Sequence, residues 1–154
     1  MKKLAFFSFL ILMSLSAEAQ FAIKAGVSFN KNEISSYALT GQYYRDLLVV
    51  SGDLFVPTQK CEKISGGARI GLGVGNYRIR FAADVGGRYQ FSQWRIGYGF
   101  EGNLRLYSQI GIFARWTKMY PICNMCGHNV VLWKCGQPEF SLGVVIDLNT
   151  ERCY

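Results

Sequence analysis

The sequence predicts an all-β fold, an eight-stranded antiparallel up-and-down β-barrel that spans a membrane. Three observations support this prediction: a leader segment at the start, apolar residues at every second position through most of the remaining chain, and turns that alternate in length. The chain has 154 residues, which fits one domain, and 50% of them are hydrophobic. This composition excludes a disordered chain.

The first nineteen residues have the features of a secretory signal peptide. Lys2 and Lys3 give a positive start, an apolar run covers residues 4–15, and Ala17-Glu18-Ala19 fits a cleavage site. The apolar run is shorter than the ~20 residues that a membrane-spanning helix needs. We therefore expect a signal peptide at 1–19, a barrel at 20–148, and at 149–154 either a periplasmic tail or the end of the last strand.

Eight segments alternate between apolar and polar residues with a period of two, as half-buried strands do. The pattern is clearest in the sixth segment, where Trp, Ile, Tyr, Phe and Leu residues alternate with Arg, Glu, Asn and Gly. In chain order the predicted strands are Phe21–Phe29, Tyr37–Tyr44, Leu47–Val56, Ala68–Asn76, Tyr77–Phe91, Trp94–Leu106, Gln109–Thr117 and Phe140–Leu148.

The predicted connections differ in length between the two ends of the barrel. Tight turns follow the second, fourth and sixth strands, at Arg45-Asp46, Gly75-Asn76 and Ser108-Gln109. Longer links are expected at the other end, at Asn30–Ser36, Pro57–Gly67 and Lys118–Glu139, and Ser92-Gln93 is a short exception there. Short periplasmic turns and longer extracellular loops are typical of outer-membrane barrels.

A soluble barrel would show the same alternation with its apolar residues inside, so periodicity alone does not exclude it. Two features favour a membrane barrel: the polar positions are rich in Gly and charge, and aromatic residues collect at the strand ends. The formal net charge of +7 lies largely on these polar positions, so we expect no nucleic-acid partner.

The charged residues of the polar face predict a narrow lumen that ion pairs fill, because buried charges need partners. Lys24 and Arg69 belong to this face. The predicted lumen charge network consists of Arg78, Arg80, Asp84, Arg95, Glu101, Arg105, Arg115 and Asp147. We expect Glu101 to pair with Arg95 or Arg105. We expect Asp84 to pair with Arg78 or Arg80.

The leader that ends before Gln20, the eight alternating segments and the final strand Phe140–Leu148 resemble the small outer-membrane β-barrel proteins of Gram-negative bacteria, especially of the Bacteroidetes. The resemblance implies an outer-membrane location, contact with outer-membrane lipid, and recognition by the insertion machinery. Such barrels commonly end on an aromatic residue. Here the chain continues beyond Leu148, and Tyr154 would restore that ending only if the last strand is longer.

Four cysteines fall in the predicted extracellular loops, at Cys61, Cys123, Cys126 and Cys135. Exported cysteines usually form disulfides, and four cysteines leave three connectivities open. A weaker alternative is a zinc site of Cys123, Cys126, His128 and Cys135, whose spacing matches no common zinc finger. Cys153 is predicted on the opposite side of the membrane. We expect no cofactor and no resident metal.

A filled barrel predicts a structural or surface-interaction role that the extracellular loops carry. Trp133 in the fourth loop is a candidate contact for an extracellular or envelope protein. One alternative is a narrow, porin-like channel with an Arg-rich lumen. Another is a lipid-modifying enzyme that uses His128, the one histidine of the sequence, but no serine motif accompanies this residue, so we do not expect an enzyme.

Overall fold

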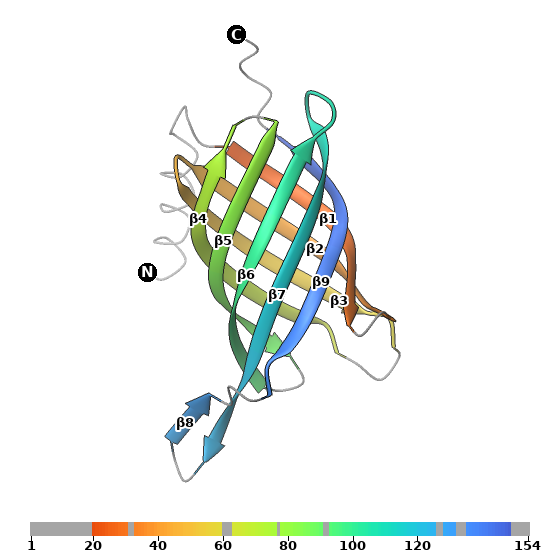
Figure 1. The fold of residues 1–154 in the computed structure, drawn as a ribbon. Coiled ribbons are helices and arrows are strands. Elements are labelled where there is room, and N and C mark those ends of the chain that lie inside the picture. Colours follow the sequence, from red (N-terminus) through yellow and green to blue (C-terminus); the bar gives the residue numbers. More distant parts are fainter. Residues whose placement is uncertain are drawn as a thin grey trace, which may run out of the picture.

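Eight antiparallel strands close into a barrel in the computed structural model, which confirms the predicted fold class (Figure 1). The structure describes residues 20–30, 33–59, 63–76, 78–90, 93–125, 128–131 and 135–148. The predicted signal peptide 1–19 and the tail 149–154 lie outside the described residues. The strands are β1 (Gln20–Asn30), β2 (Glu33–Arg45), β3 (Leu48–Pro57), β4 (Ser65–Gly75), β5 (Ile79–Gln90), β6 (Gln93–Arg105), β7 (Ile110–Met125), β8 (His128–Val131) and β9 (Gln137–Asp147).

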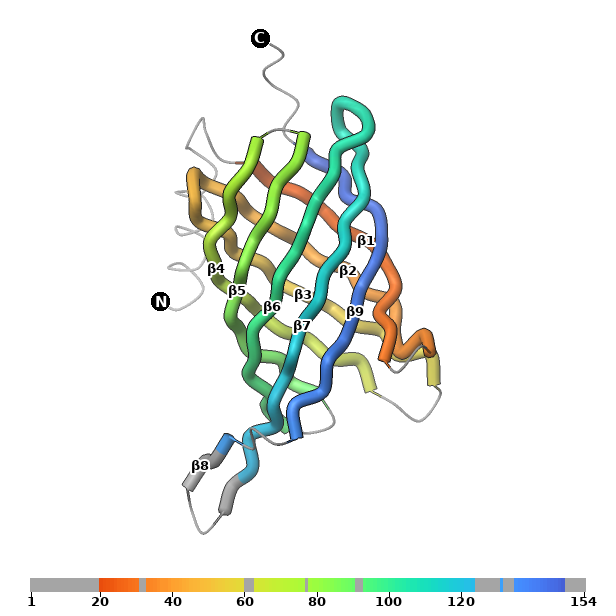
Figure 2. Tube along the Cα trace, viewed as in Figure 1, coloured from red at the N-terminus to blue at the C-terminus, as the bar shows by residue number. Residues whose placement is uncertain are grey.

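The connectivity is up-and-down, as expected. Each strand from β1 to β7 pairs with the next, β7 pairs with β9, and β9 pairs with β1 to close the barrel (Figure 2). The remaining strand, β8, pairs with β7 alone and projects from one end of the barrel (Figure 1). We call this end the mouth and the opposite end the turn end. Among the described residues, no helix is long and apolar enough to cross a bilayer.

Two predicted loops are wrong, because strands extend into them. β1 reaches Asn30 and β2 begins at Glu33, so the link expected at Asn30–Ser36 is reduced to residues 31 and 32. β7 continues beyond Thr117 to Met125, where the loop Lys118–Glu139 was expected.

Pro121 marks the position at which β7 continues beyond the barrel wall. It makes the last pair between β7 and β6, and beyond it β7 pairs with β8 instead. Proline has no N–H to donate to a ladder, so it suits the position at which β7 leaves the barrel sheet. The β7–β8 hairpin extends beyond the barrel wall, so its sequence is free of the alternation that the wall imposes.

The distribution of side chains is the reverse of that in a soluble protein. Thirty large hydrophobic side chains are exposed among the described residues, including Leu72 at 65% and Phe81 at 59%. Fifteen polar or charged residues of the same part of the chain are buried. The alternation of each strand places one set outside and the other inside, as in the outward row Val50, Ile70, Val85 and Tyr98, which are partners across four strands.

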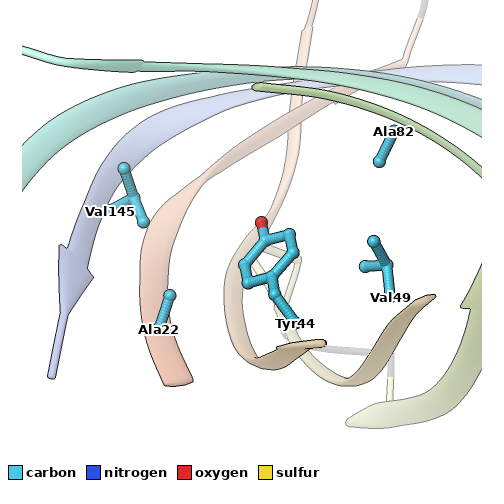
Figure 3. Packing of buried hydrophobic residues seen from close by; sticks show 5 residues of the cluster. All are labelled: Ala22, Tyr44, Val49, Ala82 and Val145. Carbon is cyan, nitrogen blue, oxygen red and sulfur yellow. The ribbon is translucent and has the colours of Figure 1, made fainter. Parts of the chain in front are cut away.

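The buried hydrophobic cluster is correspondingly small. Figure 3 shows its five members, which come from β1, β2, β3, β5 and β9: Ala22, Tyr44, Val49, Ala82 and Val145. Four of the five are Ala or Val, so this cluster fills only part of the lumen. Phe55, Phe113 and Met119 are also buried, and most of the other buried side chains are polar or charged.

Glycine permits the close contact at which the barrel closes. Gly26 of β1 and Gly143 of β9 face each other, and a Cβ atom on Gly143 would lie 2.1 Å from the carbonyl oxygen of Ala25. A Cβ atom on Gly26 would lie 2.2 Å from the carbonyl oxygen of Leu142. These contacts are with backbone atoms, so any larger residue would force the two strands apart.

We predict that Gly143→Ala lowers the free energy of unfolding by about 1–3 kcal/mol, because the added methyl group would overlap the β1 backbone. The matched control is Gly52→Ala, since a Cβ atom at Gly52 meets nothing within 4 Å. Urea unfolding of both refolded variants in detergent micelles measures the difference. Equal midpoints for the two variants would contradict this account of the closure.

Candidate functional site

Six buried charged residues cross the middle of the lumen, and we call them the central charge network. They are Lys24, Asp53, Arg69, Asp84, Glu101 and Arg115, which come from β1, β3, β4, β5, β6 and β7. None is more than 8% exposed. Three are cations and three are anions, so the network balances its own charge.

One half of the network is built around Glu101. The Lys24 ammonium group donates to Glu101 Oε1. Arg115 donates to the other oxygen, Oε2, from Nε at 2.8 Å and from Nη2 at 2.5 Å. The third nitrogen of the same guanidinium, Nη1, lies 3.2 Å from Asp53 Oδ1 and so extends the network toward β3.

The other half is built around Asp53. Arg69 binds this carboxylate through two bonds, Nε to Oδ2 at 2.6 Å and Nη2 to Oδ1 at 3.0 Å, the paired geometry that makes Arg–carboxylate contacts strong. Thr40 of β2 donates to Oδ1 at 2.6 Å. Arg69 also donates from Nη1 to Asp84 at 2.6 Å. Asp53 therefore joins the two halves into one continuous network across the lumen.

The ion pairs predicted along one strand are wrong. Glu101 pairs with Lys24 and Arg115, rather than with Arg95 or Arg105 of its own strand. Asp84 pairs with Arg69, rather than with Arg78 or Arg80. Residues four or six positions apart on a strand are separated by roughly 13 or 20 Å, so inward side chains meet those of other strands.

The other predicted lumen residues lie toward the two ends of the barrel. At the turn end, Arg105 donates from Nε to Asp147 at 2.9 Å, and Arg80 donates to Gln20 at 2.9 Å. The Arg80 guanidinium also lies 4.2 Å from the centre of the Tyr44 ring. Arg78 precedes β5 and is exposed, and it lines a small cavity at the turn end. Arg95 lies at the mouth.

Ion pairing continues at the mouth. Arg88 of β5 donates to Glu139 Oε2 of β9 at 2.6 Å, and its guanidinium lies 3.6 Å from the centre of the Phe55 ring. Arg95 donates to Gln137 Oε1 at 3.2 Å. These contacts connect the end of β5 and the start of β6 with the start of β9 across the opening.

A cavity of about 300 Å³ opens at the mouth, and we call it the mouth cavity. Its lining is mostly polar: Asn30, Ser35, Ser36, Phe55, Pro57, Lys63, Ser65, Arg88, Gln90, Arg95, Met119, Gln137, Pro138 and Glu139. A second cavity at the turn end has a volume of about 20 Å³, room for little more than one water molecule. The central charge network lies between the two.

Sequence reasoning did not single out Asp53, Arg88 or Glu139. Asp53 shares its parity with Ser51, so the alternation of β3 could have placed it in the lumen, but the apolar Val49 and Phe55 of the same face obscured the pattern. Glu139 was assigned to a loop, whereas it lies in β9. The alternation of β5 places Arg88 on the inward face, but nothing in the sequence indicates its partner.

The cysteine and zinc predictions fall partly outside the described residues. Cys123 and Cys135 are free thiols, while Cys61, Cys126, Cys153 and Trp133 lie outside the described residues. His128 belongs to β8 and is the backbone partner of Met125. The described part of the chain contains no cluster of three or more His, Cys, Asp or Glu residues that could hold a metal ion. Disulfide and zinc hypotheses therefore both stay predictions.

No protein-family model and no curated protein matches the chain. Among solved structures, it is similar to a de novo designed transmembrane β-barrel, with a TM-score of 0.55 and 11% identity over 84% of this chain and 95% of that one. The likeness is one of fold. The chain is also similar to Neisserial surface protein A, with a TM-score of 0.49 and 12% identity over 83% of this chain and 94% of that one.

We predict that Asp53→Asn lowers the free energy of unfolding by about 3–5 kcal/mol, because it leaves Arg69 and Arg115 buried without their shared anion. The control is Asp147→Asn, which removes one partner of a more exposed pair at the turn end and should cost less. Urea unfolding in micelles measures both. A smaller loss for Asp53→Asn than for Asp147→Asn would show that the central charge network is not the main polar constraint.

Proposed function

We propose that the chain is an outer-membrane β-barrel with a structural or surface-interaction role exerted at its mouth. The observation that carries this proposal is the reversed distribution of side chains, apolar outside and charged inside. Soluble monomers rarely expose a continuous apolar surface of this extent. A bilayer accommodates such a surface, and a closed barrel leaves no unpaired strand edge in lipid.

Aromatic side chains on the outer face of β6 and β7 extend from the middle of their ladder toward the mouth, where Lys118 and Tyr120 support a membrane interface. Phe100 and Trp116 stack with ring centres 6.1 Å apart, and Tyr98 lies 5.8 Å from Trp116. Lys118 follows on the same face of β7, with its ammonium group 5.7 Å from the Tyr120 ring. Aromatic rings next to a cation are typical of the level at which lipid headgroups meet the hydrocarbon.

The filled lumen favours a role at the surface over a channel. The central charge network crosses the interior with ion pairs at 2.5–3.2 Å, beside the Lys24–Glu101 contact, and the cavity at the turn end is about 20 Å³. A permeating ion would have to separate paired charges in a desolvated site. The mouth offers both a larger cavity and the projecting β7–β8 hairpin, which supports placing the function there.

We predict that Ile70→Arg prevents stable insertion into lipid vesicles, because Ile70 is 53% exposed near the middle of β4 and an Arg at the bilayer midplane costs about 2–4 kcal/mol. The matched control is Leu47→Arg, in the turn between β2 and β3, where the charge would reach water. Folding into vesicles is followed by the heat-dependent gel shift. If Ile70→Arg inserts as well as Leu47→Arg, the apolar exterior does not face lipid.

We predict that the refolded chain conducts no ions in planar bilayers, because the central charge network closes the lumen. Single-channel recording at both voltage polarities measures this directly. Arg95→Gln and Arg105→Gln serve as comparisons, since they alter the two ends of the lumen and leave the centre intact. A regular conductance step in the unsubstituted chain that either substitution abolishes would favour the pore.

A further inference from the structure

We propose that the outer wall of the barrel binds one anionic membrane lipid, with the lipid phosphate at Lys118 and the acyl chains on the aromatic residues next to it. This inference rests on the proposed function, because it requires the wall to face a bilayer. It deepens that function by naming a class of lipid and the residue that selects it.

Lys118 is the exception to the charge pattern of the barrel wall. The other described charged residues of the barrel strands face the lumen or line one of its cavities, apart from Glu33 and Arg45 at the two ends of β2. Lys118 faces outward, because its neighbours Thr117 and Met119 are the buried, inward residues of this stretch. A charge in hydrocarbon is costly, so the Lys118 ammonium group belongs at the level of the lipid headgroups.

The surroundings of Lys118 hold its side chain against the wall. The ammonium group lies 5.7 Å from the centre of the Tyr120 ring, and the cross-strand partners of Lys118 are Tyr98 and Pro138. A Cβ atom on Gly136 would lie 3.1 Å from Lys118 Cε and 2.3 Å from Tyr120 Cε1. The Gly136 backbone therefore packs closely on both side chains and restricts where the ammonium group can lie.

The bilayer offers this ammonium group an anion. The ion pairs among the described residues lie in the lumen and at its two ends, and none of them includes Lys118. Lipid phosphates are the anions at the level where aromatic rings and a cation meet the headgroups. A hydrogen bond between an ammonium group and a phosphate is charge-assisted, and so is stronger than one between neutral groups.

An apolar row lies next to Lys118, on the side toward the middle of the barrel. Trp116 is two residues nearer the middle along β7, about 7 Å away, and pairs with Phe100 of β6 and Phe140 of β9. Phe100 and Phe140 are 56% and 41% exposed, so an acyl chain that lies along the wall can contact both rings. Charge followed by apolar surface along the barrel axis matches the order of phosphate and acyl chains in a lipid.

The site needs both parts of the lipid. An exposed ion pair contributes little in water, so Lys118 alone would not retain free phosphate. Acyl chains add affinity because they remove the apolar surface of Phe100, Trp116 and Phe140 from water. A lipid without phosphate would contact the same rings but would leave Lys118 without a counter-charge.

The test is native mass spectrometry of the full refolded chain, released from micelles of a neutral polyoxyethylene detergent that contains no phosphate. The probes are dimyristoyl phosphatidylglycerol, dimyristoylglycerol and inorganic phosphate. We expect phosphatidylglycerol to bind at least about tenfold more tightly than either of the other two probes. Equal binding of the two lipids would overturn the role of the phosphate, equal binding of inorganic phosphate would overturn the role of the chains, and no retained phosphatidylglycerol would overturn the site.

Variants locate the lipid on the outer wall. Lys118→Gln should weaken phosphatidylglycerol binding about tenfold or more, whereas Lys118→Arg keeps the charge and should retain the affinity. The matched control, Lys63→Gln, removes the same charge at the mouth cavity and should leave the affinity unchanged. Equal losses for Lys118→Gln and Lys63→Gln would show that binding follows overall charge and not this site.

Insertion into phosphatidylcholine vesicles separates this proposal from the proposed function. The heat-dependent gel shift shows whether each variant forms a barrel in the bilayer before its lipid binding is measured. A chain that inserts but does not prefer phosphatidylglycerol would overturn the lipid site alone. A chain that does not insert would overturn the proposed function and the lipid site together.

Discussion

The buried charges of the lumen impose the main constraint on this structure. Removal of an ion from water costs several kcal/mol in a protein interior, so each buried charge must have an opposite charge and further hydrogen bonds. The central charge network meets this condition with three cations and three anions. Its members come from six different strands. The contacts that neutralise the charges therefore also fix how the strands are arranged around the lumen.

Asp53 has a special place because it receives hydrogen bonds from three strands, through Thr40, Arg69 and Arg115. Such an arrangement can form only once β2, β4 and β7 surround β3. The network therefore links strands that are distant along the chain, in addition to the ladders that link neighbours. The wall itself depends on residues without side chains, since Gly26 and Gly143 allow β1 and β9 to approach at the closure.

The fold was predictable because a barrel wall repeats one simple rule. Every strand must present alternate residues to the two faces, and the segment from Trp94 to Leu106 shows this rule without interruption. The rule does not say which inward charges meet, because that depends on strand stagger and not on sequence distance. Glu101 thus pairs with Lys24, which lies 77 residues away along the chain. The extent of β7 was also hidden, since the hairpin beyond Pro121 does not contribute to the wall.

The barrel is chemically divided along its axis. The turn end is nearly filled, balanced ion pairs close the centre, and the mouth holds an open cavity with a mostly polar lining. This division supports the proposal that the barrel acts through the surface at its mouth, while the rest of the barrel serves as the anchor. The apolar exterior and the charged interior are thus two consequences of the same alternation.

The most direct test of this account is a gel of the isolated outer-membrane fraction, in which unboiled and boiled samples are compared. Closed membrane barrels resist SDS until they are heated. The account predicts that the protein is found in this fraction and migrates faster without boiling. Recovery as a soluble periplasmic protein with no heat-dependent shift would contradict it, because thirty exposed large hydrophobic side chains would then face water.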